Sequence, residues 1–244
     1  MSISERQKQI LQILNDRTYI TVNELSILTF TSASSIRRDL TYLQDNGLVK
    51  RLHGGVSSVL PISNVASLYD RAHKNIKEKR VIAQKASVLL KEGQTILLDS
   101  STTVTFLIPY IAKYKNITVF TNNLSTALYS IESGIKTHCL GGCAINGSAV
   151  LSGAETYIAL NNITADIVFF SSQSLDNMGN ISDSTGEENY IRKLMLNCAK
   201  TRVFLCDSEK FNRQSTYKLC NLNDIDCAIF NTEYPELKTN IILH

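Results

Sequence analysis

The chain has 244 residues, of which 43% are hydrophobic and 19% are charged, a composition typical of a soluble globular protein with one or two domains. The formal net charge of +3 is too small to identify a polyanionic partner, so any basic surface must be local. The first residues are polar and no apolar run approaches the roughly 18 residues of a membrane span, so we expect a cytoplasmic protein without a signal peptide.

Local sequence patterns divide the chain into three parts. Residues 1–57 combine helical and strand patterns, and we expect them to form a small domain. Residues 58–74 have poor periodicity and several serine, proline and asparagine residues, so they are predicted to be a linker. Residues 75–244 begin with a helix near Ile76 and then alternate strands with helices.

Two helices are predicted before residue 30. The first runs from Ser4 to about Asp16, because its apolar residues recur at helical spacing. The second opens with Thr21, and Glu24 follows three residues later, which is the pattern of a capping box. A turn after the second helix then leads to a third.

The third helix is predicted from Ser32, its expected N-cap, to Gln44. Its apolar residues at positions 36, 40 and 43 form one stripe for burial. The opposite face gathers polar side chains in the first two turns, namely Ser34, Ser35, Arg37 and Arg38. A helix that enters the major groove reads bases with its N-terminal residues, and arginine can bind guanine or a phosphate. We therefore expect a DNA recognition helix, in which Asp39 holds one arginine by an intrahelical pair; an ordinary solvated face is the alternative.

A β-wing is predicted directly after this helix. Gly47 fits a helix C-cap, and residues 48–56 alternate roughly in polarity before a glycine pair. This arrangement would place Lys50, Arg51 and His53 near the DNA backbone, although His53 could equally be an ordinary turn residue. Together the first part predicts a winged helix-turn-helix.

Two motifs in this part resemble those of a known family. The run Ser35-Ile36-Arg37-Arg38-Asp39-Leu40, followed by Lys50-Arg51-Leu52-His53-Gly54-Gly55, is similar to the signature of the DeoR family of bacterial regulators of sugar metabolism. The resemblance extends over nearly the whole chain. It implies a C-terminal domain similar in fold to ribose-5-phosphate isomerases, which senses a phosphorylated sugar.

The third part predicts an α/β fold. Its strands are short apolar runs at Thr95–Leu98, Ile117–Phe120, Lys136–Leu140, Asp166–Phe170, Arg202–Cys206 and Cys227–Phe230. Helical patterns lie between them, at Thr102–Tyr114, Leu124–Glu132, Glu155–Asn161 and Glu187–Ala199. This alternation favours a mostly parallel sheet, in which ligands bind beyond the carboxyl ends of the strands.

The polar segment after the first of these strands is the strongest candidate for an effector site. It reads Asp99-Ser100-Ser101-Thr102-Thr103 and opens a helix, where free backbone amides and hydroxyls can hold a phosphate. Plain helix capping is the alternative, since serine and threonine are favoured there. The family usually has glycine in place of Ser101.

Later strand ends add candidates for contacts to the sugar. Asn122 matches a polar residue of the family and could bond a sugar hydroxyl, or it could simply cap a helix. Gly141 and Gly142 would allow a ligand to approach the backbone closely. The segment Ser171-Ser172-Gln173 stands where the family commonly has glycines, so the pocket is expected to differ from that of common relatives.

The resemblance also assigns four charged residues to the effector site. Asp183 leads into a helix on which Glu188 and Arg192 stand at i and i+4, where a surface ion pair is the alternative. Lys210, after the fifth strand, could neutralise a phosphate or contact a sugar oxygen.

Six cysteines are present, and most lie in apolar runs, so we expect free, buried thiols in a reducing compartment. Cys139 and Cys143 with His138 could seed a metal site, but no second cluster has ligand spacing. We therefore expect no metal, no cofactor and no catalytic residue.

The sequence thus predicts an oligomeric repressor that binds double-stranded operator DNA and responds to a phosphorylated sugar. A sugar-phosphate isomerase fused to a DNA-binding head is the second hypothesis, for which Asp183, Glu187 and Glu188 are the carboxylates that could serve as a base. A transcriptional activator of the same architecture is the third.

Overall fold

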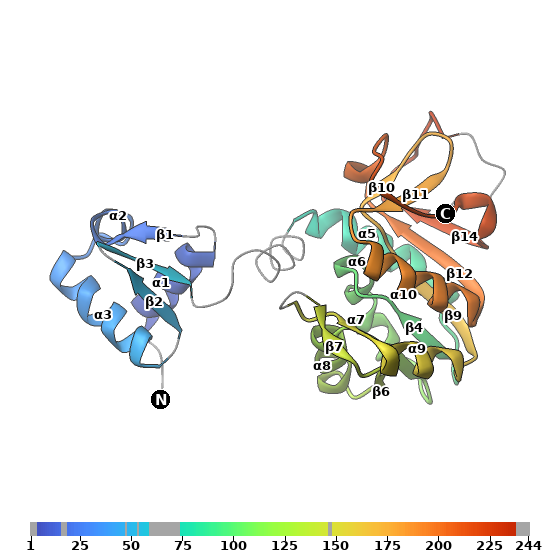
Figure 1. The fold of residues 1–244 in the computed structure, drawn as a ribbon, viewed down its shortest axis with the longest axis horizontal. Helices are drawn as coiled ribbons and strands as arrows, with labels where there is room; N and C mark the ends of the chain where they lie inside the picture. The colour runs from blue at the N-terminus through green and yellow to red at the C-terminus, as the bar shows by residue number, and fades with distance from the viewer. Residues whose placement is uncertain are drawn as a thin grey trace. The chain divides into compact units, whose positions relative to one another are not determined.

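The computed structural model describes residues 4–15, 19–46, 48–52, 54–58, 74–145 and 148–237. The chain divides into two compact units, Met1–Tyr69 and Asp70–His244, which we call the head unit and the body unit (Figure 1). None of the described helices is long and apolar enough to cross a membrane.

The head unit contains three helices and a three-stranded antiparallel sheet. The helices are α1 (Glu5–Asn15), α2 (Val22–Leu28) and α3 (Ala33–Asp45), and the strands are β1 (Tyr19–Thr21), β2 (Val49–Leu52) and β3 (Gly55–Ser58). The sheet order is β1-β3-β2. The predicted apolar stripe of α3 is confirmed, because Ile36, Leu40 and Leu43 are fully buried with Ile10 of α1 and Leu25 of α2.

The predicted caps of the head helices are also confirmed. Thr21 and Glu24 form a capping box at the start of α2, and the Ser32 side chain accepts a hydrogen bond from the Ser35 amide at the start of α3. Strand β1 was not among the predicted elements, because three residues are too few to show a period. Gly47 and His53 lie outside the described residues.

The body unit is built on a six-stranded sheet in the order β14-β12-β9-β4-β5-β6. Its strands are β4 (Thr95–Leu98), β5 (Thr118–Thr121), β6 (Lys136–Cys139), β9 (Ala165–Phe170), β12 (Ala199–Cys206) and β14 (Cys227–Phe230). Every neighbouring pair is parallel. The predicted strands and the parallel α/β fold are therefore confirmed: β4 and β14 have the predicted bounds, and the other four strands have ends shifted by one to three residues.

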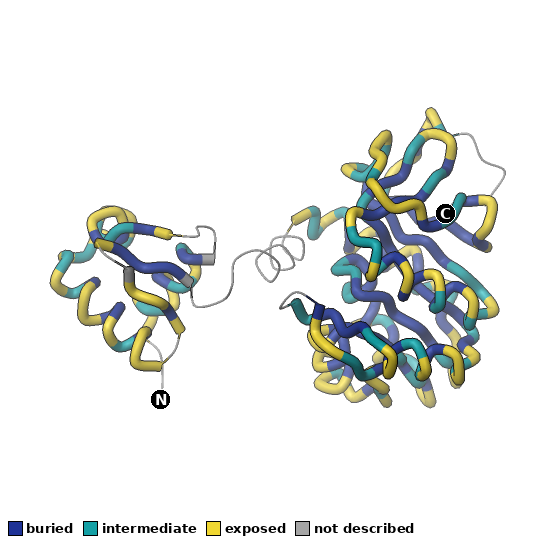
Figure 2. The backbone as a smooth tube through the Cα atoms, viewed as in Figure 1, coloured by how far each residue is buried: buried dark blue, intermediate teal, exposed yellow. Residues whose placement is uncertain are grey.

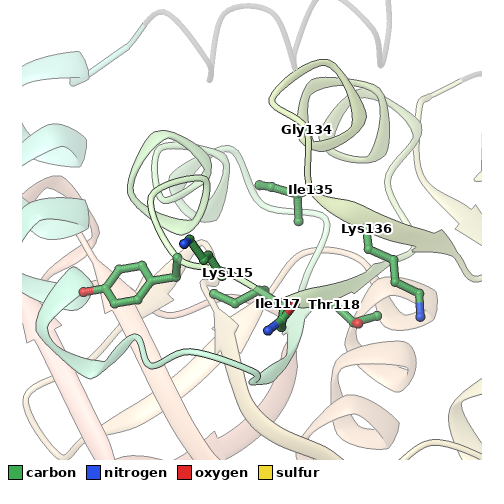
Figure 3. A pocket seen from close by; sticks show the side chains of 8 residues that line it. Lys115, Ile117, Thr118, Gly134, Ile135 and Lys136 are labelled. Atoms are coloured by element: carbon green, nitrogen blue, oxygen red, sulfur yellow. The ribbon is translucent and has the colours of Figure 1, made fainter.

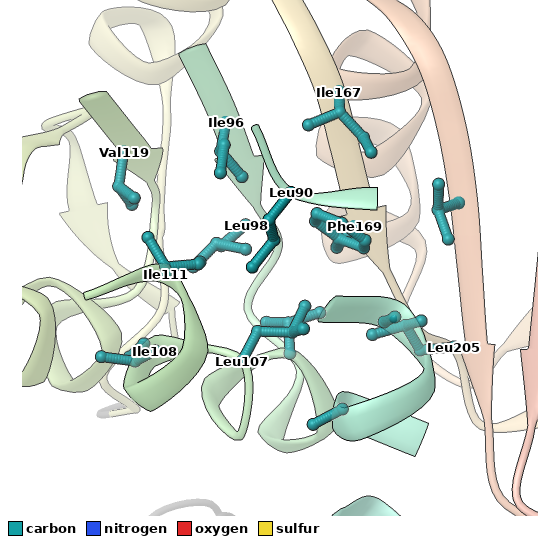
Figure 4. Packing of buried hydrophobic residues seen from close by; sticks show 14 of the residues in the cluster. Leu90, Ile96, Leu98, Leu107, Ile108, Ile111, Val119, Ile167, Phe169 and Leu205 are labelled. Atoms are coloured by element: carbon teal, nitrogen blue, oxygen red, sulfur yellow. The ribbon is translucent and has the colours of Figure 1, made fainter. Parts of the chain in front are cut away.

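Helices cover both faces of this sheet, so its central strands are buried (Figure 2). They are α5 (Ile76–Ala86), α6 (Thr102–Thr105), α7 (Ile108–Ile111), α8 (Leu124–Glu132), α9 (Ala154–Asn161) and α10 (Gly186–Asn197). On one face, Ile96, Leu98 and Phe169 pack against Leu107 and Ile111 (Figure 4). Helix α10 contacts β9 and β12, and the burial of both faces explains the continuous apolar runs in the sequence.

The prediction of one continuous helix at residues 102–114 is wrong. It forms two short helices, α6 and α7, and Pro109 lies in the first turn of α7. Proline has no amide hydrogen and its ring clashes with the carbonyl four residues earlier, so it is tolerated in a first turn but not in a helix interior.

The sequence patterns did not predict two small sheets. Strands β10 (Ser174–Leu175), β11 (Asn180–Asp183) and β13 (Tyr217–Asn221) form an antiparallel sheet in that order, and β7 (Cys143–Ala144) pairs with β8 (Leu151–Ser152). Short 3-10 turns follow three elements, namely η1 (Ser87–Leu89), η3 (Ser208–Lys210) and η4 (Leu222–Asp224). Strands β7, β8 and β10 have two residues each, which carry too little periodicity to be predicted.

Candidate functional site

The exposed face of α3 carries the arginines predicted for DNA recognition. Arg37 and Arg38 are exposed in the first half of the helix, as is Ser34. The serines are partly engaged with one another, because the Ser32 hydroxyl lies 3.0 Å from the hydroxyls of both Ser34 and Ser35. The two guanidinium groups are therefore the longest-reaching polar groups on this face.

Asp39 does not pair with an arginine of its own helix. Its carboxylate accepts hydrogen bonds from Arg6 Nε at 2.5 Å, Arg6 Nη2 at 3.3 Å and Gln7 Nε2 at 3.2 Å. Attraction to Asp39 raises the pKa of Arg6. The expected intrahelical pair is thus wrong: Asp39 lies on the inner side of α3 and fastens that helix to α1.

The wing presents its two predicted cations to solvent. Lys50 and Arg51 are exposed on β2, which pairs antiparallel with β3. Arg51 Nη1 lies 3.4 Å from Thr41 Oγ1, so the wing and the recognition helix are in contact. His53, the third residue expected here, lies outside the described part of the chain.

In the body unit, the polar segments predicted for effector binding meet at one place in the sheet. The chain runs from β4 outward to β5 and β6, and then from β9 outward in the other direction to β12 and β14. Adjacent strands β4 and β9 therefore form the topological switch point, beyond whose carboxyl ends open α/β sheets bind ligands. Asp99 follows β4 and Ser171 follows β9.

Asp99 organises these two loops and is itself fully buried. Its Oδ1 accepts a hydrogen bond from the Ser101 amide at 2.9 Å, and its Oδ2 accepts one from the Ser171 amide at 3.2 Å. Arg192 Nε donates to the same Oδ2 at 2.8 Å. Since both carboxylate oxygens are occupied within the protein, Asp99 positions the loop instead of offering a free group to a ligand.

Arg192 joins three carboxylates from three separate segments. Besides Asp99, it donates to Asp183 Oδ2 at 2.8 Å and to Glu188 Oε2 at 3.1 Å. Burial by itself lowers the pKa of Arg192, but attraction to these three carboxylates is stronger, so the pKa of the guanidinium is raised above its usual range. The predicted Glu188–Arg192 contact is present, but it belongs to a buried network and not to the surface.

Lys210 reaches the same loops from the other side. Its Nζ donates to Ser171 Oγ at 2.8 Å and lies 3.4 Å from Asp207 Oδ2. One fifth of its side chain remains exposed, whereas the side chain of Arg192 is almost completely buried. Lys210 is therefore the cation of this site best placed to meet an anionic ligand.

Three buried polar atoms near these loops lack a partner. Within the described residues, Ser101 Oγ, Thr103 Oγ1 and Asn122 Oδ1 have no hydrogen-bond partner. Asn122 uses its amide nitrogen to bond the Leu151 carbonyl at 2.9 Å. A buried polar group without a partner costs stability, and these three atoms follow the adjacent strands β4 and β5.

Contacts within the protein explain why glycine occupies positions 141 and 142, after β6. A Cβ on Gly142 would lie 2.5 Å from both the Ser152 carbonyl oxygen and Thr156 Oγ1, and Gly142 has φ +105°. Gly141 has φ +73°, and its carbonyl accepts a hydrogen bond from Thr156 Oγ1 at 2.7 Å. Close packing against β8 and α9 therefore requires small residues here, whether or not a ligand approaches.

The cysteines were expected to be free and buried, and this expectation is only partly confirmed. All six are free; Cys139 and Cys143 are exposed, Cys198 and Cys220 are partly buried, and Cys206 and Cys227 are buried. His138 stacks on Phe120 with ring centroids 4.6 Å apart. In the described part of the chain, no group of three or more His, Cys, Asp or Glu residues could hold a metal ion.

The surface of the body unit also has two grooves. One, of about 620 Å³, is lined by Lys115, Ile117, Thr118 and Lys136 at the amino ends of β5 and β6 (Figure 3). The other, of about 270 Å³, lies between α10 and β13 and includes Asn189 and Tyr190. Because the strands are parallel, the larger groove lies at the opposite end of the sheet from Asp99.

Family comparisons identify both units. A model described as the DeoR C terminal sensor domain matches residues 74–232, and one described as the DeoR-like helix-turn-helix domain matches residues 6–61. The chain belongs to the DeoR family. It is thus a DNA-binding transcriptional regulator, and this family of regulators is not one of enzymes.

Individual relatives of this DeoR-family chain carry regulator names. The HTH-type transcriptional regulator GolR of Listeria innocua is 32% identical over 92% of this chain and 89% of its own length. The putative aga operon transcriptional repressor of Escherichia coli O157:H7 is 30% identical over 95% and 87%. The lactose phosphotransferase system repressor of Staphylococcus aureus is 27% identical over 97% and 95%.

Solved structures are similar to this chain only at low TM-score and low sequence identity. A D-ribose-5-phosphate isomerase in complex with phospho-erythronic acid has a TM-score of 0.42 and 16% identity, over 55% of this chain and 52% of its own. The match therefore spans about half the length of that isomerase. The eIF2B delta of Chaetomium thermophilum has a TM-score of 0.48 and 15% identity, over 94% and 71%.

Proposed function

We propose that this DeoR-family regulator represses an operon of sugar metabolism and is controlled by a phosphorylated sugar bound at the carboxyl ends of β4, β5 and β9. Two relatives named as repressors, of the aga operon and of the lactose phosphotransferase system, support the choice of a repressor and of a sugar operon. A regulator of this kind acts on chromosomal DNA, so its compartment would be the cytoplasm.

The DNA-binding residues in this proposal lie on α3 and on the wing. Arg37 and Arg38 would contact base edges or phosphates, with Ser32, Ser34 and Ser35 allowing close approach at the start of the helix. Lys50, Arg51 and His53 would contact the DNA backbone. Support comes from the exposure of both arginines, of Lys50 and of Arg51.

Replacing Arg38 with alanine tests this assignment. We expect loss of operator binding at fixed salt, because an exposed guanidinium on the recognition face is removed and no buried contact is broken. The thermal shift caused by an effector should stay unchanged. Wild-type operator affinity in Arg38→Ala would contradict the assignment of the recognition helix.

The observation that carries the effector site is the trio of unpartnered buried atoms on Ser101, Thr103 and Asn122. In this proposal the phosphate lies against residues Ser100–Thr103, whose loop Asp99 holds in place. The sugar lies toward Asn122, Gly141 and Gly142 on one side and Lys210 on the other. Asp183, Glu188 and Arg192 support the site, since the guanidinium of Arg192 donates to both carboxylates.

A thermal-shift panel tests the effector site. The full chain would be measured with fructose 1-phosphate, glucose 6-phosphate, galactose 6-phosphate, tagatose 6-phosphate and ribose 5-phosphate, and with the same sugars without phosphate. We expect at least one phosphorylated sugar, and none of the free sugars, to raise Tm. If no phosphorylated sugar raises Tm or changes operator affinity, the proposed effector class is wrong.

Two serine variants sharpen this test. Ser101→Ala removes a hydroxyl without a partner, so the free protein should keep its stability while the ligand-induced shift falls. Ser130→Ala is the matched control, because its buried hydroxyl donates to the Thr126 carbonyl at 2.8 Å. Its loss should lower the Tm of the free protein and leave the ligand-induced shift intact.

We also propose that the regulator acts as a homo-oligomer. Leu124, Leu128 and Ile131 lie at i, i+4 and i+7 on α8, and each is about half exposed. An exposed apolar stripe of this kind supports contact with another protein surface. Light scattering on the full chain, compared with Leu128→Lys, would test this; a monomeric wild-type protein would contradict it.

A further inference from the structure

Helix α5, at the start of the body unit, begins at a residue with an unusual backbone conformation. Asn75 has φ 56° and ψ 39°, the left-handed conformation, and it is the N-cap of α5. Its carbonyl accepts the amide of Lys79 at 3.0 Å, the first turn of that helix. The Asn75 side chain does not cap α5, and its Nδ2 instead donates to Asp207 Oδ1 at 3.1 Å.

Asp207 connects this residue to the candidate effector site. Its side chain is almost completely buried, and its Oδ2 lies 3.4 Å from Lys210 Nζ. That distance is within ion-pair range, although Oδ2 makes no hydrogen bond of good geometry in the described part of the chain. One buried carboxylate thus faces Asn75 with one oxygen and Lys210 with the other.

A second contact runs beside the first. Lys74 Nζ lies 2.5 Å from Glu209 Oε2, in the same 3-10 turn as Lys210. Hydrogen bonds from Lys74 and Asn75 lower the pKa of Glu209. The turn Ser208–Lys210 is therefore bonded to the two residues that precede α5, of which Lys74 is the last residue of the segment predicted to be the linker.

From this arrangement we propose that Asp207 couples the effector site to the start of α5, and so to the segment that leads to the head unit. The coupling residues are Lys210, Asp207 and Asn75. This inference rests on the proposed function, in that Lys210 is taken to meet the anionic ligand.

The physical basis is competition for one cation. An anion near Lys210 attracts its ammonium group away from Asp207, and the buried carboxylate then lacks a compensating charge. A buried charge that loses its partner is strongly unfavourable, so Asp207 must find other partners. Its remaining hydrogen bond is to Asn75, a residue already held in a sparsely populated backbone conformation. A change at Asn75 alters how the chain enters α5.

A ligand-free experiment tests the coupling itself. Lys210→Met keeps the aliphatic stem but removes the charge, as capture by an anion would. We expect hydrogen exchange of the Lys79 amide, measured by NMR on the full chain, to be about tenfold faster or more. Adding Asp207→Asn removes the unpaired charge, so the double variant should return toward the wild-type rate.

The control is Lys200→Met, because Lys200 pairs with Asp166 at 2.9 Å on the surface and its loss gives the same change in net charge. It should leave the exchange of the Lys79 amide unchanged. A wild-type exchange rate in Lys210→Met, or no recovery in the double variant, would overturn the coupling.

A second experiment follows the coupling to DNA. Asn75→Gly permits the same positive φ but removes the amide that bonds Asp207. The Tm shift with the active sugar phosphate of the panel should persist, while the effect of that compound on operator affinity falls at least about fivefold. Asn116→Gly is the matched control, since Asn116 also has a positive φ of 59° and lies at the opposite end of the sheet; it should behave as wild type.

The outcomes separate the two proposals. If no compound of the panel raises the Tm or changes the operator affinity of the wild-type protein, the proposed function is wrong. The hydrogen-exchange experiment still tests the coupling in that case, because it uses no ligand. If wild type and Asn75→Gly respond equally to the same compound, the effector assignment stands and the coupling through Asn75 is wrong.

Discussion

Arg192 Nε lies 2.8 Å from Asp99 Oδ2, and this ion pair joins α10 to the loop after β4 with both side chains almost completely buried. The two residues are 93 positions apart. Because Arg192 also bonds Asp183 and Glu188, one guanidinium group links carboxylates from three segments. The shape of the candidate effector site therefore depends on a residue that does not itself reach the surface.

Removing this guanidinium should destabilise the body unit strongly. Arg192→Met leaves Asp99 and Asp183 buried without their partner, and breaking a buried pair in this way costs about 3–5 kcal/mol. Urea denaturation would measure the loss. Arg202→Ala is the control, because its pair with Asp226 is more than one third exposed on both sides and should contribute less than about 1 kcal/mol. Similar losses in the two variants would contradict the structural role of Arg192.

Asp39 and Arg38 are neighbours in sequence with opposite expected effects. Asp39→Asn weakens the contact of α3 with Arg6 and Gln7 of α1, so the thermal midpoint of the head unit should fall. Arg38→Ala removes an exposed side chain, so it should change the free energy of unfolding by less than about 0.5 kcal/mol and leave that midpoint close to wild type. Calorimetry on both variants, beside operator binding, separates folding from recognition. An unchanged midpoint in Asp39→Asn would argue against the contact with α1.

The wing should contribute to DNA binding mainly through charge. A plot of the logarithm of the DNA-binding constant against the logarithm of salt concentration has a negative slope. Lys50→Ala should make that slope shallower by about 0.9, the value for one phosphate contact. The preference among operator sequences should stay the same, because a phosphate contact does not read bases. Binding titrations at several salt concentrations measure both quantities. A slope equal to that of wild type would place Lys50 away from the phosphates.

The thiols should differ in reactivity according to burial. Burial raises the pKa of Cys206 and of Cys220 to about 12, so at pH 8 almost no reactive thiolate is present. Cys139 and Cys143 are exposed and should be alkylated first by iodoacetamide. Peptide mass spectrometry of the native and the urea-unfolded protein would show this order. Early modification of Cys206 in the native protein would contradict it.

Gly142 should tolerate a side chain less well than Gly134. Both have positive φ, so alanine costs about 1–2 kcal/mol of backbone strain at each position. At Gly142 the new Cβ also meets the Ser152 carbonyl and Thr156 Oγ1 at 2.5 Å, whereas nothing lies within 4 Å at Gly134. Overpacking adds about 1–3 kcal/mol more. Denaturation midpoints of Gly142→Ala and Gly134→Ala would show the difference, and equal midpoints would exclude the clash.

Local patterns in the sequence were enough to predict most elements of the fold. The stripe at Ile36, Leu40 and Leu43, the capping box of Thr21 and Glu24, and six apolar strand runs each depend on residues close together in the chain. Pro109 could have shown that α6 and α7 are separate, since its effect on a helix interior is also local. The Arg-Arg-Asp motif with the wing was specific enough to indicate the family.

The partners of charged side chains depended on the tertiary structure. Asp39 was predicted to pair within its own helix but bonds Arg6, 33 residues earlier. Glu188 and Arg192 were predicted to be neighbours, yet their burial with Asp99 and Asp183 follows only from the order of the strands. Lys210 meets Ser171 across 39 residues, and Asp207 meets Asn75 across 132. The sequence by itself determined which residues could carry charge and which would form helices or strands, because those properties are local. Only the folded sheet decided which charges are buried together, because ion pairs form wherever the topology brings their atoms within a few ångströms.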